Sequence, residues 1–290
     1  MIRNNARLTL KARLSQPEIV VAPGVFDMIS VRLADSMKFD CLYMTGYGTV
    51  ASYLGEPDAG LATYTDMLNR VTAFCQASDT PIICDGDTGY GGLLNVAHTV
   101  RGYERAGAAG IQLEDQEFPK KCGHTPGRRV IAADDMVRKI KVAVETRVDP
   151  DFQIIARTDA RTSLGLDEAL RRGEAYVRAG ADILFIESPE TPEELEKIGK
   201  SFDKPLLVNI VEGGRTPQLT PAELEALGFS LAIYPASGFL AVTHALEHVY
   251  TQIQALKGTN GEQDAMYSFA KMCDLMGFPA VWDFDRQHAD

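Results

Sequence analysis

Short apolar segments recur along the chain, and they mostly alternate with helix-like stretches. Several of the segments are rich in β-branched residues. They occupy positions 19–22, 41–44, 81–84, 110–113, 153–156, 183–186, 206–209 and 231–234. Near-continuous apolar strands separated by helices are typical of a parallel sheet that is buried on both faces. The hydropathy pattern therefore predicts eight parallel strands.

An internal repeat supports this count. The sequence Arg-Ala-Gly-Ala occurs at 105–108 and again at 178–181, and each copy directly precedes an apolar segment that ends in glutamate. In both copies we expect a helix to end at the glycine and a strand to follow at once. Eight strand–helix units in 290 residues favour an α/β fold of one closed (β/α)8 barrel of the TIM type over an open doubly wound sheet.

The region after the eighth strand exceeds what barrel closure needs. Two further helix-like stretches lie at about 239–256 and 262–276, the second followed by Gly277-Phe278-Pro279. No linker rich in Pro, Gly or Ser divides the chain, so we expect residues 1–290 to form a single barrel domain. We expect 239–290 to be a C-terminal helical region that takes part in oligomer contacts.

Composition excludes several classes of function. The net charge of −11 argues against a broad nucleic-acid-binding face. No apolar run approaches the roughly 20 residues of a membrane span, and the first residues lack the apolar core of a secretory signal. The five cysteines are dispersed without CxxC pairs, which argues against a disulfide framework and a zinc cluster. We therefore expect a cytoplasmic protein with neither nucleic acid nor membrane as a partner.

Acidic residues gather where the third and fourth strands end. In a barrel of this kind the carboxyl ends of the strands converge on one face. Asp85 and Asp87 are two positions apart, so in an extended segment they leave on the same face, and Glu114 ends the adjacent strand. An all-carboxylate cluster favours Mg²⁺, with Mn²⁺ as an alternative. The competing interpretation is a structural network satisfied by Arg157, but one arginine cannot balance three acids.

Two loop features are weaker indications of a site. Asp58 lies in the loop after the second strand, where an acid is ordinarily a turn former or solvated. The segment Thr45-Gly46-Tyr47-Gly48 directly follows the same strand and offers backbone N–H groups that could hold a carboxylate or phosphate.

A basic loop at 117–129 surrounds one cysteine. It concentrates cationic side chains near Cys122, namely those of Lys120, Lys121, His124, Arg128 and Arg129. Nearby cations lower the pKa of a thiol and make it a usable proton donor or acceptor. Prolines and glycines at both ends suit a lid that closes over an anionic substrate. A solvated basic loop with an incidental cysteine is the alternative, and composition leaves both open.

The motif Lys-Lys-Cys-Gly-His at 120–124 resembles that of the isocitrate lyase/phosphoenolpyruvate mutase superfamily, in its carbon–carbon lyase branch. The resemblance spans nearly the whole chain. It includes 23–24 with Asp27, 45–47, Asp85-Gly86-Asp87-Thr88-Gly89-Tyr90-Gly91, 114–116, 156–159, and Asn209 with 212–214.

This resemblance implies roles for individual residues. The implied metal ligands are Asp85, Asp87 and Glu114. The implied catalytic residues are Cys122, Arg157, Tyr43, Lys121 and His124, with the Cys122 thiol protonating the carbanion and Arg157 holding the future keto oxygen. The implied substrate-binding residues are Thr45, Gly46, Tyr47, Asp58, Gly123, Glu187 and Asn209. The base that deprotonates the substrate stays open between Tyr43 and a water on the metal.

The resemblance further implies a Mg²⁺-dependent lyase that cleaves a 2-hydroxy-dicarboxylate, of the 2-methylisocitrate or 2,3-dialkylmalate type, to pyruvate and a carboxylic acid. Gln112 stands where isocitrate and methylisocitrate lyases usually have histidine, and 209–217 is more similar to 2,3-dimethylmalate lyases. The alternatives are an oxaloacetate hydrolase, which Pro235 in place of serine weakens, a phosphonopyruvate-processing enzyme, and an inactive ligand-binding barrel. The family also implies a homotetramer with exchange of the C-terminal helix.

Overall fold

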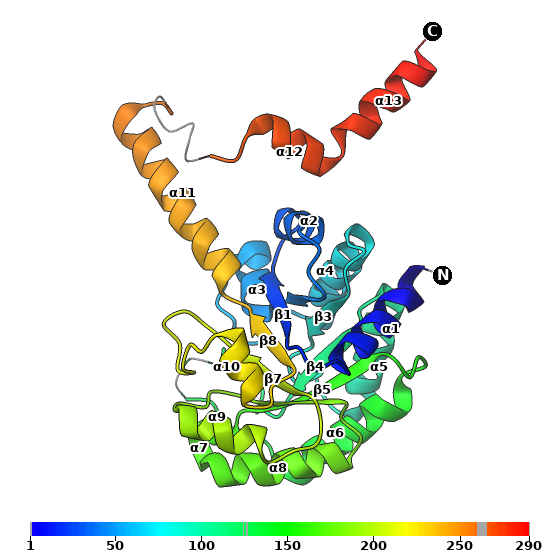
Figure 1. Cartoon of the computed structure of the whole chain (residues 1–290), viewed down its shortest axis with the longest axis vertical. Helices are drawn as coiled ribbons and strands as arrows, with labels where there is room; N and C mark the ends of the chain where they lie inside the picture. The colour runs from blue at the N-terminus through cyan, green and yellow to red at the C-terminus, as the bar shows by residue number, and fades with distance from the viewer. Residues whose placement is uncertain (1, 124, 126, 260–265, 290) are drawn as a thin grey trace.

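The structure, a computed structural model, describes residues 2–123, 125, 127–259 and 266–289. Eight parallel strands pair in chain order and close into a barrel (Figure 1). They are β1 Val20–Val25, β2 Leu42–Met44, β3 Ile82–Asp85, β4 Gly110–Glu114, β5 Gln153–Thr158, β6 Ile183–Ile186, β7 Leu206–Asn209 and β8 Leu231–Tyr234. Each overlaps its predicted segment, so the prediction of a closed (β/α)8 barrel is confirmed.

Helices surround the strands. They are α2 Met28–Ser36, α3 Gly46–Leu54, α4 Tyr64–Ala77, α5 Leu93–Ala106, α6 Ala133–Thr146, α7 Ala160–Leu164, α8 Leu166–Arg178, α9 Pro192–Gly199 and α10 Pro221–Ala226. The internal repeat predicts two of the helix ends. Helix α5 stops at Gly107, whose φ of 106° lies in the left-handed region that favours glycine. Helix α8 stops one residue earlier than expected, at Ala179, and Gly180 has the left-handed φ.

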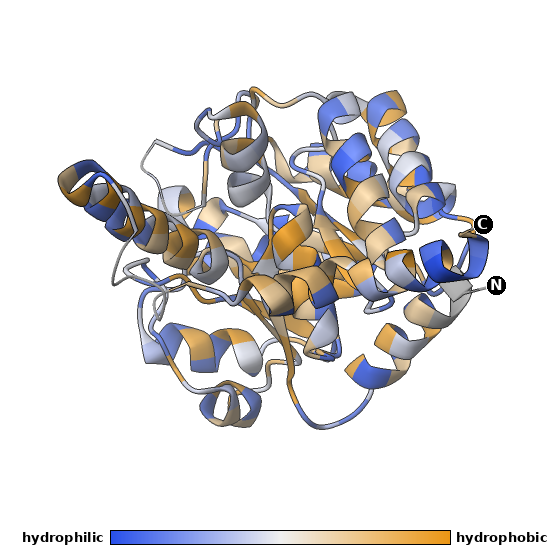
Figure 2. Ribbon diagram, turned by 90° about the horizontal axis from the view of Figure 1, so that it is seen from above, coloured by the Kyte–Doolittle hydropathy of each residue, from blue (hydrophilic) through white to orange (hydrophobic). Residues whose placement is uncertain are grey.

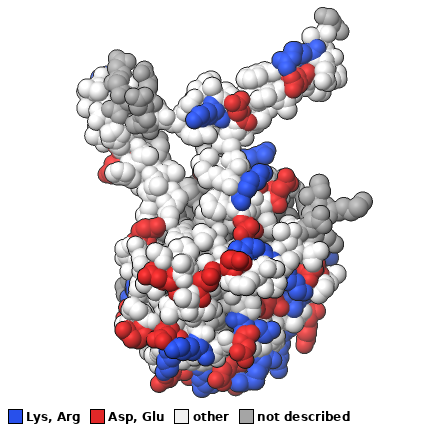
Figure 3. All heavy atoms as spheres, in the orientation of Figure 1, with Lys and Arg blue, Asp and Glu red and all other residues white. Residues whose placement is uncertain are grey.

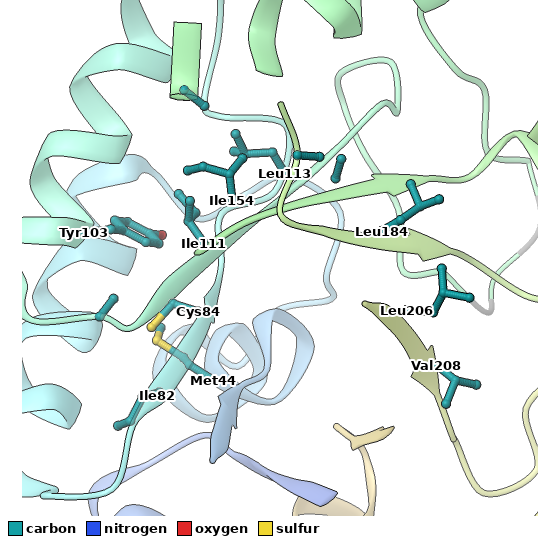
Figure 4. Packing of buried hydrophobic residues seen from close by; sticks show 14 of the residues in the cluster. Met44, Ile82, Cys84, Tyr103, Ile111, Leu113, Ile154, Leu184, Leu206 and Val208 are labelled. Carbon is teal, nitrogen blue, oxygen red and sulfur yellow. The ribbon is translucent and has the colours of Figure 1, made fainter. Parts of the chain in front are cut away.

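Two apolar layers hold the barrel together. One lies between the strands and the helices, and Figure 4 shows Met44, Ile111 and Leu184 among its members. The other fills the barrel interior with inward-facing side chains, so apolar colour runs through the strands at the centre of Figure 2. Helix α1 (Ile2–Leu14), which the sequence pattern did not predict, adds Leu10 and Leu14 to this inner layer beside the first residues of the strands.

Strand alternation places the functional side chains. Ile83, Ile155, Phe185 and Leu207 belong to the inner apolar layer, and the next inward positions are Asp85, Arg157, Glu187 and Asn209. The barrel interior therefore changes from apolar to charged at the carboxyl ends of its strands.

Among the described residues, three helices follow the barrel. Helix α11 (Ser237–Leu256) confirms the first C-terminal prediction and projects away from the barrel, followed by α12 (Phe269–Met276) and α13 (Phe278–His288) (Figure 1). The predicted 262–276 stretch is helical from Phe269 onward, and 260–265 lie outside the described residues. Helix α13 was missed because Pro279 looked like the end of a helix, whereas it lies in the first turn, where proline is tolerated. In the described ranges, no helix has the length and apolar character needed to cross a membrane.

Candidate active site

A cavity of about 260 Å³ opens at the carboxyl ends of the strands. Ten residues predicted for the site line it: Tyr43, Thr45, Tyr47, Asp58, Asp85, Cys122, Gly123, Arg157, Glu187 and Asn209. Gly46, Asp87 and Glu114 adjoin these residues without lining the cavity. The sequence therefore identified most of the polar wall.

Asp85 and Asp87 come together in a way that the sequence did not predict. Strand β3 ends at Asp85, and Asp87 has a φ of 48°, so the two do not alternate along one extended segment. The chain turns instead, and the Asp87 backbone N–H donates to Asp85 Oδ1 at 3.0 Å. The extended-strand argument was wrong for Asp87, although the two carboxylates are neighbours.

Lys120 lies in the middle of the carboxylates and is almost completely buried. Its ammonium group forms ion pairs with Asp58 and, at 2.5 Å, with Asp87 Oδ1. Burial alone would lower the pKa of Lys120, but Asp87 and Asp58 outweigh it and hold that pKa well above its ordinary value. The sequence indicated only that Lys120 belongs to a basic loop, because nothing in two adjacent lysines shows which side chain turns inward.

The negative charge of the carboxylates in the site is still larger than the positive charge of the cationic side chains around them. Burial raises the pKa of Asp87 to about 7; Lys120 opposes this shift, whereas Asp85 and Asp58 add to it. Burial also raises the pKa of Glu114 well above its ordinary value, against the effect of Arg157. Glu114 Oε1 is buried and has no hydrogen-bond partner among the described residues. This is the electrostatic situation that a bound cation relieves.

The donor set fits a hard divalent cation. Asp85, Asp87 and Glu114 provide only oxygen atoms, which suits Mg²⁺ or Mn²⁺ better than zinc. Within the described ranges, no three His, Cys, Asp or Glu side chains are already arranged to hold a metal ion. The excess of buried negative charge, rather than a preformed ligand geometry, therefore supports a metal site here.

A hydrogen-bonded chain links Tyr43 to Asp85. The Tyr43 hydroxyl donates to Gln112 Oε1 at 2.9 Å, and Gln112 Nε2 lies 3.4 Å from Asp85 Oδ1. Burial and the Asp85 charge hold the pKa of Tyr43 well above its ordinary value, although Arg157 acts in the opposite direction. The Tyr43 hydroxyl therefore acts as a hydrogen-bond donor to Gln112 in this arrangement.

The amino end of α3 faces the same cavity. Thr45 is its N-cap residue and makes no side-chain capping bond, so the first-turn N–H groups are not capped by it. A Cβ on Gly46 would lie 2.5 Å from Asp85 Oδ2, so only glycine lets the backbone approach this carboxylate so closely. Helix amino termini of this kind bind carboxylates.

Arg157 is fixed by three carboxylates. Its Nε and Nη2 donate to the two oxygens of Asp159, both at 2.9 Å, while Glu114 and Glu187 each approach within 3.3 Å. Burial would lower the pKa of Arg157, but these carboxylates, Asp159 first among them, raise it well above its ordinary value. The guanidinium therefore stays charged and keeps one orientation.

Glu187 is held from two sides. Asn209 Nδ2 donates to its Oε2 at 3.1 Å, and the backbone N–H and hydroxyl of Ser188 donate to its Oε1. Ser188 has a left-handed φ of 58°, which turns the chain directly after β6. Neither Ser188 nor Asp159 was predicted as a site residue.

The loop with Cys122 lies against this charged wall. A Cβ on Gly123 would be 2.5 Å from Arg157 Nη2 and 2.7 Å from Glu187 Oε2. The Ser188 hydroxyl donates to the Gly123 carbonyl at 3.0 Å. Cys122 is half-buried and lines the cavity. The loop is thus closed over the site, as a lid would be.

The four basic residues of this loop that the structure describes have partners of their own. Lys120 pairs with Asp58 and Asp87, Arg128 with Asp159, and Arg129 with Glu117. Lys121 is exposed, donates to the Gly127 carbonyl and does not line the cavity. His124 lies outside the described residues. The influence of these cations on the pKa of the Cys122 thiol stays a prediction.

The cavity also has an apolar wall, of which the sequence indicated only Pro235. It consists of Phe185, Val211, Ile233, Pro235, Ala236, Phe239 and Leu240. Two of these residues come from the first turn of α11, which the sequence assigned to oligomer contacts. Apolar residues in a helix carry no chemical indication of a site, so only the fold could reveal them.

Comparison with known proteins shows the family of this chain. The family model described as phosphoenolpyruvate phosphomutase matches residues 10–254. The chain is 49% identical over 285 residues to the 2,3-dimethylmalate lyase of Eubacterium barkeri, covering 98% of this chain and 99% of that protein. It is 39% identical to the 2-methylisocitrate lyase of Aeropyrum pernix, with 98% and 90% covered.

A solved structure of oxaloacetate acetylhydrolase, in complex with the inhibitor 3,3-difluorooxalacetate, superimposes with a TM-score of 0.93. It is 34% identical and covers 98% of this chain and 97% of its own. The chain therefore belongs to the phosphoenolpyruvate mutase/isocitrate lyase superfamily of enzymes, among relatives that are lyases.

Proposed function

We propose that this enzyme is a carbon–carbon lyase that depends on Mg²⁺. Mn²⁺ can replace Mg²⁺ as the cofactor. Its substrate is a 2-hydroxy-dicarboxylate of the 2-methylisocitrate or 2,3-dialkylmalate type, and its products are pyruvate and a carboxylic acid. The observation that supports this best is one cavity lined by Asp85, by the clamped Arg157 and by the lid thiol of Cys122. The lyase relatives support the reaction class.

The metal would be held by Asp85, with Asp87 and Glu114 beside it. When bound, it would polarise the 2-oxygen of the substrate and offset the negative charge that develops on cleavage.

The protein itself binds and orients the substrate. The first-turn N–H groups of α3, together with Thr45 and Tyr47, are suited to the carboxylate of the half that becomes pyruvate. Arg157 donates to the 2-oxygen, and the raised pKa of its guanidinium keeps the donor charged as that oxygen becomes a ketone. The 2-hydroxyl proton passes to a base, for which Tyr43 and a water at the metal site are the two candidates.

Cleavage moves electrons toward the second half. The bond between C2 and C3 breaks, and its electron pair passes to C3 and the adjacent carboxylate as an enolate-like dianion. Glu187 and Asn209 line the pocket for this half. The Cys122 thiol delivers a proton to C3, which releases the second carboxylic acid. Gly123 and the closed lid keep water from competing for the carbanion.

We also propose a homotetramer with exchange of the C-terminal helix. Helix α11 buries none of its residues, although half a dozen large apolar side chains lie along it. Phe269 in α12 is 84% exposed, and Trp282 and Phe284 in α13 are exposed as well. Figure 3 shows few charged side chains on this projecting region compared with the barrel. Exposed apolar surface of this extent supports burial against other copies of the chain.

The remaining expectations stay proposals. We propose that residues 1–290 form one domain and that the protein works in the cytoplasm without a nucleic-acid or membrane partner. None of the five cysteines forms a disulfide, which supports a reducing compartment.

A pyruvate-release assay coupled to lactate dehydrogenase tests the lyase proposal. Wild-type protein is incubated with 2-methylisocitrate, 2,3-dimethylmalate or isocitrate, with and without Mg²⁺. Pyruvate from either of the first two substrates, dependent on Mg²⁺ and abolished in Cys122→Ser, is the expected result. Cys273→Ser, in α12 and outside the cavity lining, is the matched control and keeps activity. Oxalate from oxaloacetate without any pyruvate would instead identify a hydrolase, despite Pro235.

A further inference from the structure

Asp115 is a completely buried carboxylate beside the site, and the proposed mechanism does not use it. It directly follows Glu114, the last residue of β4, and its side chain is 0% exposed. It does not belong to the residues that line the cavity. Burial of a charged group is unfavourable unless hydrogen bonds and an opposite charge compensate for it. The partners of Asp115 therefore indicate its role.

Four described groups donate to the Asp115 carboxylate. Its Oδ2 accepts hydrogen bonds from the Tyr176 hydroxyl at 2.7 Å, from Arg172 Nη1 at 2.9 Å and from the Thr158 hydroxyl at 2.7 Å. Its Oδ1 accepts the backbone N–H of Asp159 at 2.9 Å. Tyr176 and Arg172 belong to α8, whereas Thr158 is the last residue of β5 and Asp159 follows it. The carboxylate therefore joins α8 to the carboxyl end of β5.

The backbone N–H of Asp159 lies at a turn that directs its side chain. Asp159 has a φ of −97° and a ψ of 8°, between the strand and helix regions. With this turn its carboxylate comes back to Arg157, two positions earlier, and accepts from Nε and Nη2, both at 2.9 Å. The backbone N–H of Asp115 also donates to the Arg157 carbonyl at 3.2 Å. Asp115 therefore holds the end of β5 on both sides of Thr158.

We propose that Asp115 is a positioning residue for Arg157. Its Oδ1 fixes the turn at Asp159, and the Asp159 carboxylate then orients the guanidinium toward the 2-oxygen of the substrate. Arg172 supplies the opposite charge that stabilises Asp115 in its buried place. This inference rests on the lyase activity proposed above for the task of Arg157, whereas the control of its orientation does not depend on that activity. A displacement of about 1 Å near the reacting atoms can lower the rate by roughly a hundredfold.

The variant Asp115→Asn leaves a single side-chain oxygen for two kinds of donor. The charged Arg172 attracts that oxygen, so it turns away from the Asp159 N–H. In Asp115→Asn/Arg172→Met the cation is gone, and the amide oxygen can return to the Asp159 N–H. We expect kcat for pyruvate release to fall by about tenfold or more in the single variant, with KM changed by less than about threefold. The double variant should recover at least about fivefold in kcat over the single variant.

Asp182→Asn is the matched control. Asp182 Oδ2 accepts the backbone N–H of Ile154 at 2.9 Å and pairs with Arg147, so it holds the amino end of β5 in a similar way. This variant should lose stability in urea and keep the kcat of the wild type. A loss of kcat in Asp182→Asn equal to that in Asp115→Asn would indicate a purely structural role and overturn the inference.

Crystal structures of the wild type and the variants give a measurement that needs no activity. Arg157 Nε, 2.9 Å from Asp159 Oδ2 in the wild type, should be displaced by about 1 Å or more in Asp115→Asn and return in the double variant. An unmoved Arg157 in Asp115→Asn, or a kcat equal to that of the wild type, would overturn the inference.

Two further outcomes have separate meanings. If the wild type releases no pyruvate from any substrate, the lyase proposal fails, and the crystal structures alone decide whether Asp115 positions Arg157. If Asp115→Asn does not fold, Asp115→Leu/Arg172→Met takes its place, with the same results expected relative to Asp115→Asn/Arg172→Met. It removes the acceptor for the Asp159 N–H without leaving Arg172 as an unpaired buried charge.

Discussion

Lys120 Nζ lies 2.5 Å from Asp87 Oδ1, so a residue of the lid reaches into the buried carboxylate cluster at the bottom of the site. Asp58, from the loop after β2, pairs with the same ammonium group. One side chain thus joins the lid, the loop after β2 and the turn after β3. Since both carboxylates are buried, removing the cation leaves them without compensation in a poorly solvated place.

The variant Lys120→Met tests this relationship through stability. It keeps most of the apolar stem and removes the charge. Removing one partner of a buried ion pair lowers the free energy of unfolding by about 3–5 kcal/mol. Asp87 can take up a proton and so avoid an unpaired buried charge, which keeps the expected loss near the lower figure. We expect the free energy of unfolding in urea, measured in EDTA, to fall by about 3 kcal/mol.

Added Mg²⁺ should restore part of that loss, because a divalent cation would neutralise the same carboxylates. Lys121→Met is the control, since the Lys121 side chain is exposed and donates to the Gly127 carbonyl. A Lys120→Met protein as stable as the wild type in EDTA would contradict the central role of this ion pair. Stability that does not respond to Mg²⁺ would count against the metal site.

Gly123→Ala should hold the lid away from the charged wall. The added methyl group would meet Arg157 Nη2 at 2.5 Å and Glu187 Oε2 at 2.7 Å, and both side chains are fixed by other contacts. We expect kcat/KM for pyruvate release to fall by roughly a hundredfold, because about 1 Å of misplacement is enough for such a loss. The melting temperature should stay close to that of the wild type.

The matched control is Gly92→Ala, because a Cβ at Gly92 has no neighbour within 4 Å and its φ of −80° suits alanine. Activity of Gly123→Ala equal to that of Gly92→Ala would show that closure of the lid does not depend on this close contact.

The strand ends were predictable because they follow from alternation alone. Once Ile155 faces inward, Arg157 must face inward two positions later in the same strand. Asp87 departs from this rule because the strand has ended before it, and a left-handed turn sets its direction. Alternation therefore predicts positions inside a strand and not beyond its end.

The rest of the site depends on contacts between distant segments. The inward turn of Lys120 results from Asp58, 62 positions earlier in the chain, and the apolar wall from a helix that follows the last strand. Neither of these contacts produces a recognisable pattern in the neighbouring sequence. The motif of the lid identified Cys122 and Gly123 through family resemblance, and composition alone left both interpretations of the loop open.

Acid should remove the contribution of Asp35, a carboxylate far from the site. Burial raises the pKa of Asp35, but hydrogen bonds from Thr80, Ser78 and Asp79 outweigh this effect and lower it below its ordinary value of 3.8. A carboxyl group whose pKa is lowered by folding stabilises the fold above its unfolded pKa, and this contribution is lost as pH falls through the folded value.

Asp35→Asn should therefore lower the free energy of unfolding by on the order of 1 kcal/mol at pH 7, a modest value because the group is largely exposed to solvent. The difference between variant and wild type should be the same at pH 7 and pH 5, and it should shrink below about pH 4. Urea titrations at these pH values measure it. A difference that is unchanged at pH 3 would show that charge on Asp35 is not the cause.

Assembly should depend on the apolar side chains of α13. Trp282 and Phe284 are exposed in the single chain, and exposed aromatic side chains of this size are costly to leave in water. Trp282→Asp combined with Phe284→Asp would place two unpaired charges in a buried interface if the helix packs against another copy. We expect sedimentation velocity to show a tetramer for the wild type and smaller species for the double variant.

The barrel should survive this change, because none of the residues of α13 is buried in the single chain. Far-ultraviolet circular dichroism of the double variant should therefore remain close to that of the wild type. Leu94→Asp is the control: this leucine is 82% exposed in the first turn of α5, where an acidic residue suits the helix. A tetramer in all three proteins would mean that α13 does not hold the assembly. If the wild type were monomeric, the apolar surface of α11 and α13 would have to be covered by a partner other than this chain.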